Sequence, residues 1–162
     1  MSKEEIKELN EEVEVAQEAS SDSTEETKEL TPEETLKSLQ ERRMGTFKVD
    51  LSVNDATYLR NLVEKTKFKG PQQAYLILIA KSEMTQVRDT LKDLDKTERH
   101  TVDITSATIE SLSYFMNNKE SSGTESANKL FAASMILRPA VSQINQLDQE
   151  ISELQKSIQG EK

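Results

Sequence analysis

Residues 49–59 read "VDLSVNDATYL" and residues 102–112 read "VDITSATIESL", and this near-repetition organises most of the chain. At the same offset of 53 positions, residues 49–95 and 102–148 align without a gap and share eight identical residues. Most other matched positions of these opening stretches keep their apolar or polar character. We therefore interpret the two segments as an internal duplication.

Each copy predicts a short strand followed by a capped helix. Alternating apolar residues mark the strands, at Phe47, Val49 and Leu51 in the first copy and at Val102 and Ile104 in the second. Ser52 and Thr105 follow as helix N-caps, and Asp55 completes a capping-box pattern with Ser52. The inner face of the helix is predicted to hold Ala56, Leu59, Leu62 and Val63, or Ile109, Leu112, Phe115 and Met116.

A second helix follows a glycine turn in each copy, at Gly70 and Gly123. Its start signal is Pro71 in the first copy and Thr124 in the second. Apolar residues alternate by three and four along both helices, at Ile77, Ala80, Met84, Val87, Leu91 and Leu94, and at Leu130, Ala133, Leu137 and Ala140. The run "AYLILIA" at 74–80 is apolar on all sides, which predicts that it lies in the middle of the core.

The second copy continues into a C-terminal seam with the same heptad spacing. This seam comprises Ile144, Leu147, Ile151, Leu154 and Ile158. Pro139 removes a helical hydrogen bond ahead of it, so we expect either a kink or two helices in sequence. Because such a narrow apolar stripe is only marginally stable alone, we expect the seam to mediate homo-oligomerisation or to pack on the second helix of the first copy.

The acidity of the chain is concentrated at its N-terminus. Residues 1–43 hold 14 acidic and 6 basic side chains, whereas residues 44–162 hold 16 and 15. A thin stripe predicts a weak amphipathic helix over residues 2–19, and the polar stretch after it reads as a flexible linker. Thr31 as N-cap and Pro32 at the first helical position then begin a short docking helix.

Together these patterns predict a mostly α fold of the α+β class, with a duplicated strand-helix-helix unit and a coiled-coil-like C-terminal helix. The expected organisation is an acidic flexible arm at 1–30, a docking helix at 31–45, a first unit at 46–99, a second unit at 100–140 and a heptad helix at 141–162. The sequence lacks cysteine and has no apolar run of membrane-spanning length, so we expect a cytoplasmic protein without membrane contact. Its composition suits a bacterial or phage protein.

No constellation in the sequence favours an enzyme. His100 is the only histidine, and without cysteine it cannot build a zinc cage or a catalytic triad of the Cys-His type. Asp89, Asp93, Asp95 and Glu98 cluster without the glycine turn of a calcium loop. We therefore expect no enzymatic activity, no metal, no cofactor and no small-molecule substrate.

The repeated pattern resembles the ribbon-helix-helix family, with "FKVDLSVNDATYLRNLVEKTKFKGPQQAYLILIA" as one unit and "HTVDITSATIESLSYFMNNKESSGTESANKLFAA" as the other. The resemblance implies two strands paired as a ribbon that enters the major groove of DNA. A second helix over 71–95 overshoots its strand by about 19 Å, and the linker "KTERH" reaches about 17 Å. Either this helix frays before Leu94, or the strands do not pair within one chain.

The resemblance also implies which positions would face DNA. These outward ribbon positions are Thr46, Lys48 and Asp50, and Thr101, Asp103 and Thr105. Two aspartates there oppose phosphate binding, whereas the basic turn with Lys65, Lys67 and Lys69 supports it. Two functions follow: an assembly or adaptor protein that binds a protein partner, and a DNA-binding transcriptional regulator. The nearly neutral charge of residues 44–162 favours the adaptor.

Overall fold

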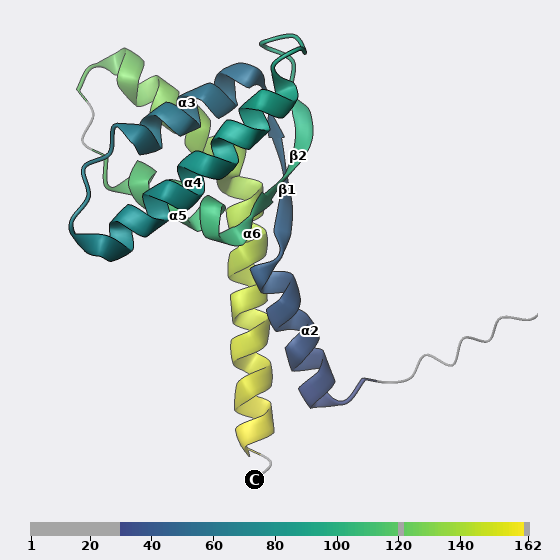
Figure 1. Cartoon of the computed structure of the whole chain (residues 1–162). Coiled ribbons are helices and arrows are strands. Elements are labelled where there is room, and N and C mark those ends of the chain that lie inside the picture. Colours follow the sequence, from purple (N-terminus) through teal and green to yellow (C-terminus); the bar gives the residue numbers. More distant parts are fainter. Residues whose placement is uncertain (1–29, 120–121, 161–162) are drawn as a thin grey trace, which may run out of the picture. The chain divides into compact units, whose positions relative to one another are not determined.

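The structure is a computed structural model of the full chain, and it describes residues 30–119 and 122–160. In chain order its elements are α2 (Pro32–Met44), β1 (Thr46–Leu51), α3 (Val53–Glu64), α4 (Gly70–Leu91), β2 (His100–Thr105), α5 (Ser106–Asn117) and α6 (Thr124–Gly160) (Figure 1). The predicted fold class is confirmed, since helices predominate around two short strands. The helix predicted over residues 2–19 and the linker after it lie outside the described residues. No helix in the described ranges combines the length and the apolar character needed to cross a membrane.

The two strands pair with each other in antiparallel orientation within the one chain. Val49 lies opposite Val102, and these two residues are also equivalent under the 53-residue offset. An antiparallel pair centred on equivalent residues has a twofold axis at its centre, so β1 and β2 are related by a pseudo-twofold axis through this pair. We call β1, α3 and α4 the first unit, and β2, α5 and α6 the second unit.

The chain closes this ribbon because α4 ends early. α3 has 12 residues and α4 has 22, so they travel about 18 and 33 Å. α4 therefore extends about 15 Å beyond the ribbon, and residues 92–99 must span this distance to bring the chain back to β2. Eight extended residues reach about 26 Å, which is sufficient. The first alternative from the sequence therefore holds, and Leu94 lies beyond the helix with 43% of its surface exposed instead of continuing the apolar seam.

Local signals in the sequence place the starts of α2 and α3 correctly. Thr31 and Glu34 form a complete capping box at the start of α2, and Ser52 and Asp55 form another at the start of α3. The two turn glycines adopt the left-handed backbone conformation that other residues avoid, with φ of 78° at Gly70 and 86° at Gly123. The caps and the glycines thus define the two-helix units before tertiary packing is considered.

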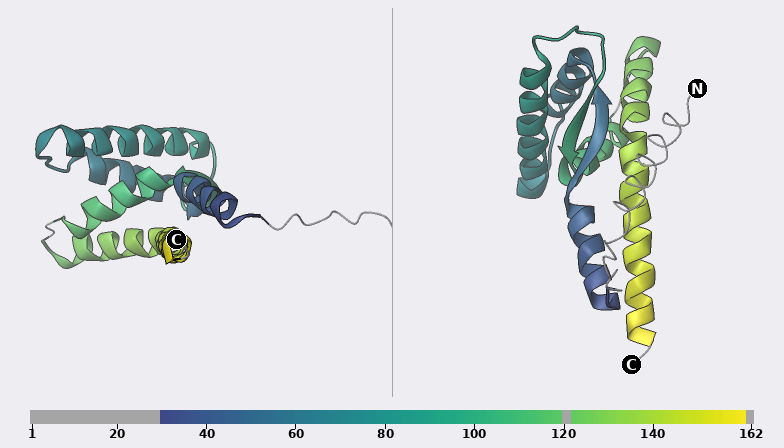
Figure 2. Two further views of the ribbon diagram at one scale, coloured as in Figure 1. Left: turned by 90° about the horizontal axis from the view of Figure 1, so that it is seen from below. Right: turned by 90° about the vertical axis from the view of Figure 1, so that its right-hand side faces the viewer.

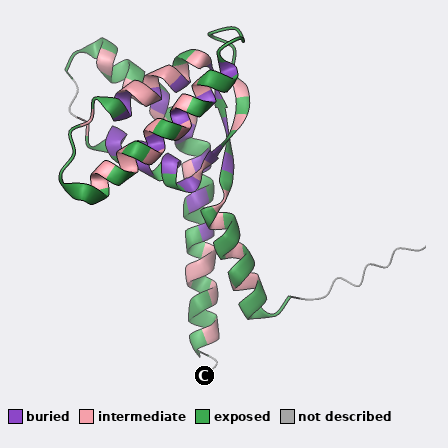
Figure 3. Ribbon diagram, viewed as in Figure 1, coloured by how far each residue is buried: buried purple, intermediate pink, exposed green. Residues whose placement is uncertain are grey.

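One hydrophobic core joins the ribbon to the helices of both units. All eight residues predicted for the inner faces of α3 and α5 are buried, as are Phe47, Val49 and Leu51 on β1 and Ile104 on β2. The prediction that residues 74–80 occupy the middle of this core is wrong. Tyr75 and Leu78 each keep 64% of their surface exposed, because α4 packs on α3 and α5 with one stripe only (Figure 3).

α6 is one helix of 37 residues with Pro139 inside it, so of the two alternatives, a kink or two successive helices, the second does not hold. Figure 2 shows instead that α6 changes direction along its length: in the left view its green part runs across the picture and its yellow part is seen end-on. A bend is the expected response of a continuous helix to an internal proline.

Candidate functional site

The outward face of the ribbon carries more acid than base. Lys48 on β1 lies opposite Asp103 on β2, and Asp50 lies opposite Thr101, whose hydroxyl donates a hydrogen bond of 2.6 Å to the Asp50 carboxylate. All four are exposed. One ammonium group against two carboxylates gives this face a negative charge, which repels DNA phosphates.

The end of the ribbon is occupied by an intramolecular contact. The carboxylate of Glu83 on α4 accepts hydrogen bonds from the backbone N–H of Thr105 at 2.8 Å and from its hydroxyl at 2.6 Å. Thr105 also caps α5, since its side chain accepts from the backbone N–H of Thr108. The predicted outward position Thr105 is therefore half-buried and already bonded to its own chain.

The structure does not bring Lys48 together with the other three candidate lysines. Lys65, Lys67 and Lys69 lie in the turn between α3 and α4, and all three are exposed. α3 separates this turn from the ribbon, and its 12 residues extend about 18 Å (Figure 1). The lysines thus belong to the end of the first unit that lies away from the ribbon.

Two of these lysines line a hollow of about 500 Å³ together with a residue that the sequence analysis missed. Lys65 and Lys67 come from the turn after α3, and the third lysine in the lining is Lys119, which follows α5. The duplication contains the signal that could have found Lys119, because it is equivalent to Thr66 in the basic turn.

The C-terminal seam is covered along part of its length by α2. α2 runs antiparallel to the C-terminal half of α6 and lies beside it in both views (Figures 1 and 2). We call α2 and residues 141–160 of α6 the helical stalk. Because α4 makes no comparable contact with α6, the seam does not pack on the second helix of the first unit as one alternative held.

Arg43 fixes α2 to the second unit. Its guanidinium donates to the Asp148 carboxylate on α6 at 2.6 Å and to Glu110 on α5 at 2.5 Å. The hydrogen bond to Asp148 is the main reason that the pKa of Arg43 is raised above its ordinary value. Only 19% of this side chain is exposed, although both carboxylates are about half exposed. No local pattern in the sequence points to Arg43, since its two partners are distant in the chain.

The five predicted oligomerisation residues divide into two groups. Ile144 and Leu147 are buried within the chain, with 2% and 6% of their surfaces exposed. Ile151, Leu154 and Ile158 are only half-buried, and α2 contributes no buried residue to cover them. The outer part of the stalk therefore retains an incompletely covered apolar stripe.

Further large apolar residues are exposed on the two second helices. Tyr75 and Leu78 lie on α4, and Phe131 and Met135 lie on α6 with 67% and 44% of their surfaces exposed. Leu78 and Phe131 are equivalent under the 53-residue offset. Each unit thus exposes a bulky apolar side chain at the same place on its second helix.

The acidic residues near the end of α4 make contacts within the chain. The Asp95 carboxylate accepts from the backbone N–H and hydroxyl of Thr97 and from the backbone N–H of Glu98, and these bonds lower the pKa of Asp95. Asp89 pairs with Arg88 at 2.6 Å. Within residues 30–119 and 122–160, no group of acidic or histidine side chains is arranged to hold a metal ion.

His100 lies at the start of β2 in the first position of the ribbon pair. It is half-buried and stands opposite Leu51, with its Nε2 atom 3.9 Å from the Glu98 carboxylate.

No protein-family model matches the sequence, and comparisons with curated proteins and with solved structures gave no significant match.

Proposed function

We propose that this chain is a non-enzymatic assembly or adaptor protein that self-associates through its helical stalk and binds a protein partner. The observation that carries the proposal is the half-buried stripe of Ile151, Leu154 and Ile158 on α6. Two helices side by side cannot enclose an apolar seam from every direction, and apolar surface left in water favours association. A second stalk would cover the stripe and complete a bundle of helices.

The test compares two variants that add the same charge to α6. Ile151→Glu with Leu154→Glu places two carboxylates in the stripe, whereas Gln155→Glu with Gln159→Glu places two on exposed positions of the same helix. Sedimentation equilibrium should show an oligomer for the parent chain and the control variant, and a monomer for the stripe variant. Circular dichroism should show similar helical content in all three proteins, so that loss of folding is not mistaken for loss of assembly.

Two results would contradict the proposal. If the parent chain sediments as a monomer at all concentrations, the proposed self-association through the stalk is wrong. A stripe variant that keeps the full oligomer mass shows that copies associate through another surface.

A DNA-binding regulator is the second candidate, and the intrachain pairing of β1 and β2 favours it. A paired ribbon is what the resemblance to the ribbon-helix-helix family requires, while the acidic outward face opposes it. Binding should then depend on Lys48 and decrease steeply with salt, because each neutralised phosphate releases counterions. Fluorescence anisotropy with host genomic fragments distinguishes the two functions. Specific binding tighter than about 10⁻⁷ M at about 200 mM salt, if lost in Lys48→Ala, would favour the DNA-binding regulator over the adaptor.

A further inference from the structure

The lysine-lined hollow lies where the ends of α3 and α5 come together. Its lining includes three pairs that are equivalent under the 53-residue offset: Leu62 with Phe115, Lys65 with Asn118, and Thr66 with Lys119. A site lined by both members of such pairs lies on the pseudo-twofold axis. α3 and α5 both begin at the ribbon and end at the hollow, so the ribbon and the hollow occupy opposite ends of this axis.

The hollow carries an excess of positive charge in an acidic protein. Three ammonium groups line it, from Lys65, Lys67 and Lys119, and none of its described lining residues is a carboxylate. The C-termini of α3 and α5 supply partial negative charges of about 0.5 each, which offset roughly one of the three positive charges. By contrast, the hollow between β1 and α6 contains a carboxylate, Glu150, which matches one of the two cations there, Arg42 and Lys48.

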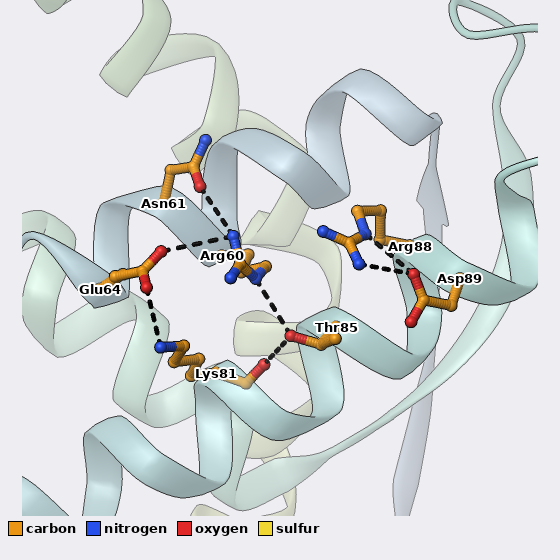
Figure 4. Close-up of polar contacts among 7 residues, drawn as sticks. All are labelled: Arg60, Asn61, Glu64, Lys81, Thr85, Arg88 and Asp89. Carbon is orange, nitrogen blue, oxygen red and sulfur yellow. Dashed lines mark hydrogen bonds and ion pairs between the residues drawn. The ribbon is translucent and has the colours of Figure 1, made fainter.

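The acidic residue that precedes Lys65 in the chain is engaged elsewhere. Glu64 ends α3, and its carboxylate binds the Lys81 ammonium at 2.8 Å and the Arg60 guanidinium at 3.3 Å (Figure 4). These two contacts are the main reasons that the pKa of Glu64 is lowered. Glu64 is therefore matched by two cations of its own and is absent from the lining of the hollow.

The base of the hollow is apolar and one wall is aromatic. Leu62 and Phe115 have only 2% of their surfaces exposed, and the Tyr114 ring packs edge-on against Phe115 with 5.5 Å between ring centroids. The Gln73 side-chain amide donates to the Tyr114 hydroxyl at 3.0 Å, which joins α4 to α5 across the hollow. A cationic rim above an apolar base fits a ligand that has both carboxylates and an apolar group.

We propose that this hollow binds an acidic segment of a protein partner, in which carboxylates pair with the lysines and an apolar side chain rests on Leu62 and Phe115. The inference rests on the proposed adaptor function and names the chemistry of its partner. A volume of about 500 Å³ accommodates a few side chains. An extended nucleic acid needs a longer basic surface, and the ribbon at the other end of the axis is acidic.

The experiment uses the full chain and a fluorescent peptide in which glutamates flank a central phenylalanine. A second peptide with glutamine at every glutamate position tests whether the carboxylates are needed. The site variant is Lys65→Gln with Lys67→Gln, and the matched control is Lys92→Gln with Lys96→Gln, two exposed lysines in the turn after α4. Both variants remove two positive charges, so they differ in location alone.

Anisotropy titrations should show that the glutamate peptide binds the parent and the control variant equally well. Exposed charge pairs contribute about two- to fivefold each, so the site variant should bind about four- to 25-fold more weakly. The glutamine peptide should bind at least tenfold more weakly than the glutamate peptide. Equal weakening in the site and control variants would overturn the proposal, as would no weakening in either.

Competition separates the peptide from other anions. Unlabelled glutamate peptide should displace the probe, whereas inorganic phosphate and a single-stranded oligonucleotide at equal charge concentration should displace it far less. Displacement by the oligonucleotide at lower concentration than by the peptide would overturn the proposal in favour of a nucleic-acid site. Sedimentation of the site variant should show the parent oligomer mass, so a failure of this inference leaves self-association through the stalk intact.

Discussion

The two strand-helix-helix units keep the same core and differ in where their second helices end. Leu59 and its equivalent Leu112 are both fully buried, and Met84 and its equivalent Leu137 are 0% and 1% exposed. α4 ends at Leu91 so that the ribbon can close, whereas α6 continues to Gly160 and pairs with α2. The difference teaches that the duplicated pattern forms the core, while the part that is not duplicated carries the surface proposed for assembly.

The largest expected effect tests whether the two cores are equivalent. Leu59→Ala and Leu112→Ala each leave a cavity at a fully buried position, and each should lower the free energy of unfolding by about 2 to 5 kcal/mol. Urea titration followed by circular dichroism measures both. Because the buried residues form one cluster, both variants should unfold in a single transition. Two separate transitions, or a loss at only one position, would show that the units are stabilised independently.

The turn glycines should give a smaller and again equal effect. Gly70→Ala and Gly123→Ala place a side chain in the left-handed region, which costs about 1 to 2 kcal/mol of folding free energy. No atom lies within 4 Å of the added carbon at either site, so the cost is conformational and not steric. Gly160→Ala at the end of α6 is the control, and thermal unfolding should show no comparable loss there.

The contact of Arg43 with Asp148 distinguishes the two units, because it attaches α2 to the second unit. Its contribution to stability can be measured. A double-mutant cycle with Arg43→Ala and Asp148→Ala should give a coupling of about 0.5 to 1 kcal/mol in the free energy of unfolding. The coupling should decrease at high salt. Arg42→Ala, at an exposed neighbouring position, should show no coupling to Asp148.

The smallest expected effect concerns the cap of α2. Glu34 accepts from the backbone N–H and hydroxyl of Thr31, which lowers the pKa of its carboxyl below the ordinary value of 4.5. A carboxyl with a lowered pKa stabilises the folded state above its unfolded pKa and loses that contribution as the pH falls through the folded pKa. Amide chemical shifts of Thr31 and Glu34 should therefore change only in acid, and Glu34→Gln should abolish the change.

Local chemistry explains which features the sequence could predict. The alternation of Phe47, Val49 and Leu51 sets the inner face of β1, and the capping residues set the starts of the helices. These signals act within a few residues, so they can be read without knowledge of packing. They account for the strands, the inner faces of α3 and α5 and both glycine turns.

Tertiary packing decided what the sequence could not show. The run at 74–80 is apolar on all sides, but α4 has neighbours on one side only, so Tyr75 and Leu78 remain exposed. Lys119 lines the same hollow as Lys65 and Lys67 only because the ends of α3 and α5 come together in the folded chain. The four candidate lysines divide between two ends of the first unit because α3 lies between them.

The most direct test of the central claim measures the distance between stalks of two copies. The sequence has no cysteine, so a single cysteine at Gln155 on the stalk, or at Thr90 near the end of α4, carries one spin label per chain. We predict a defined dipolar distance between copies for the Gln155 label, which weakens on dilution with unlabelled protein. An absent dipolar coupling at Gln155, or a defined distance at Thr90 instead, would contradict assembly through the stalk.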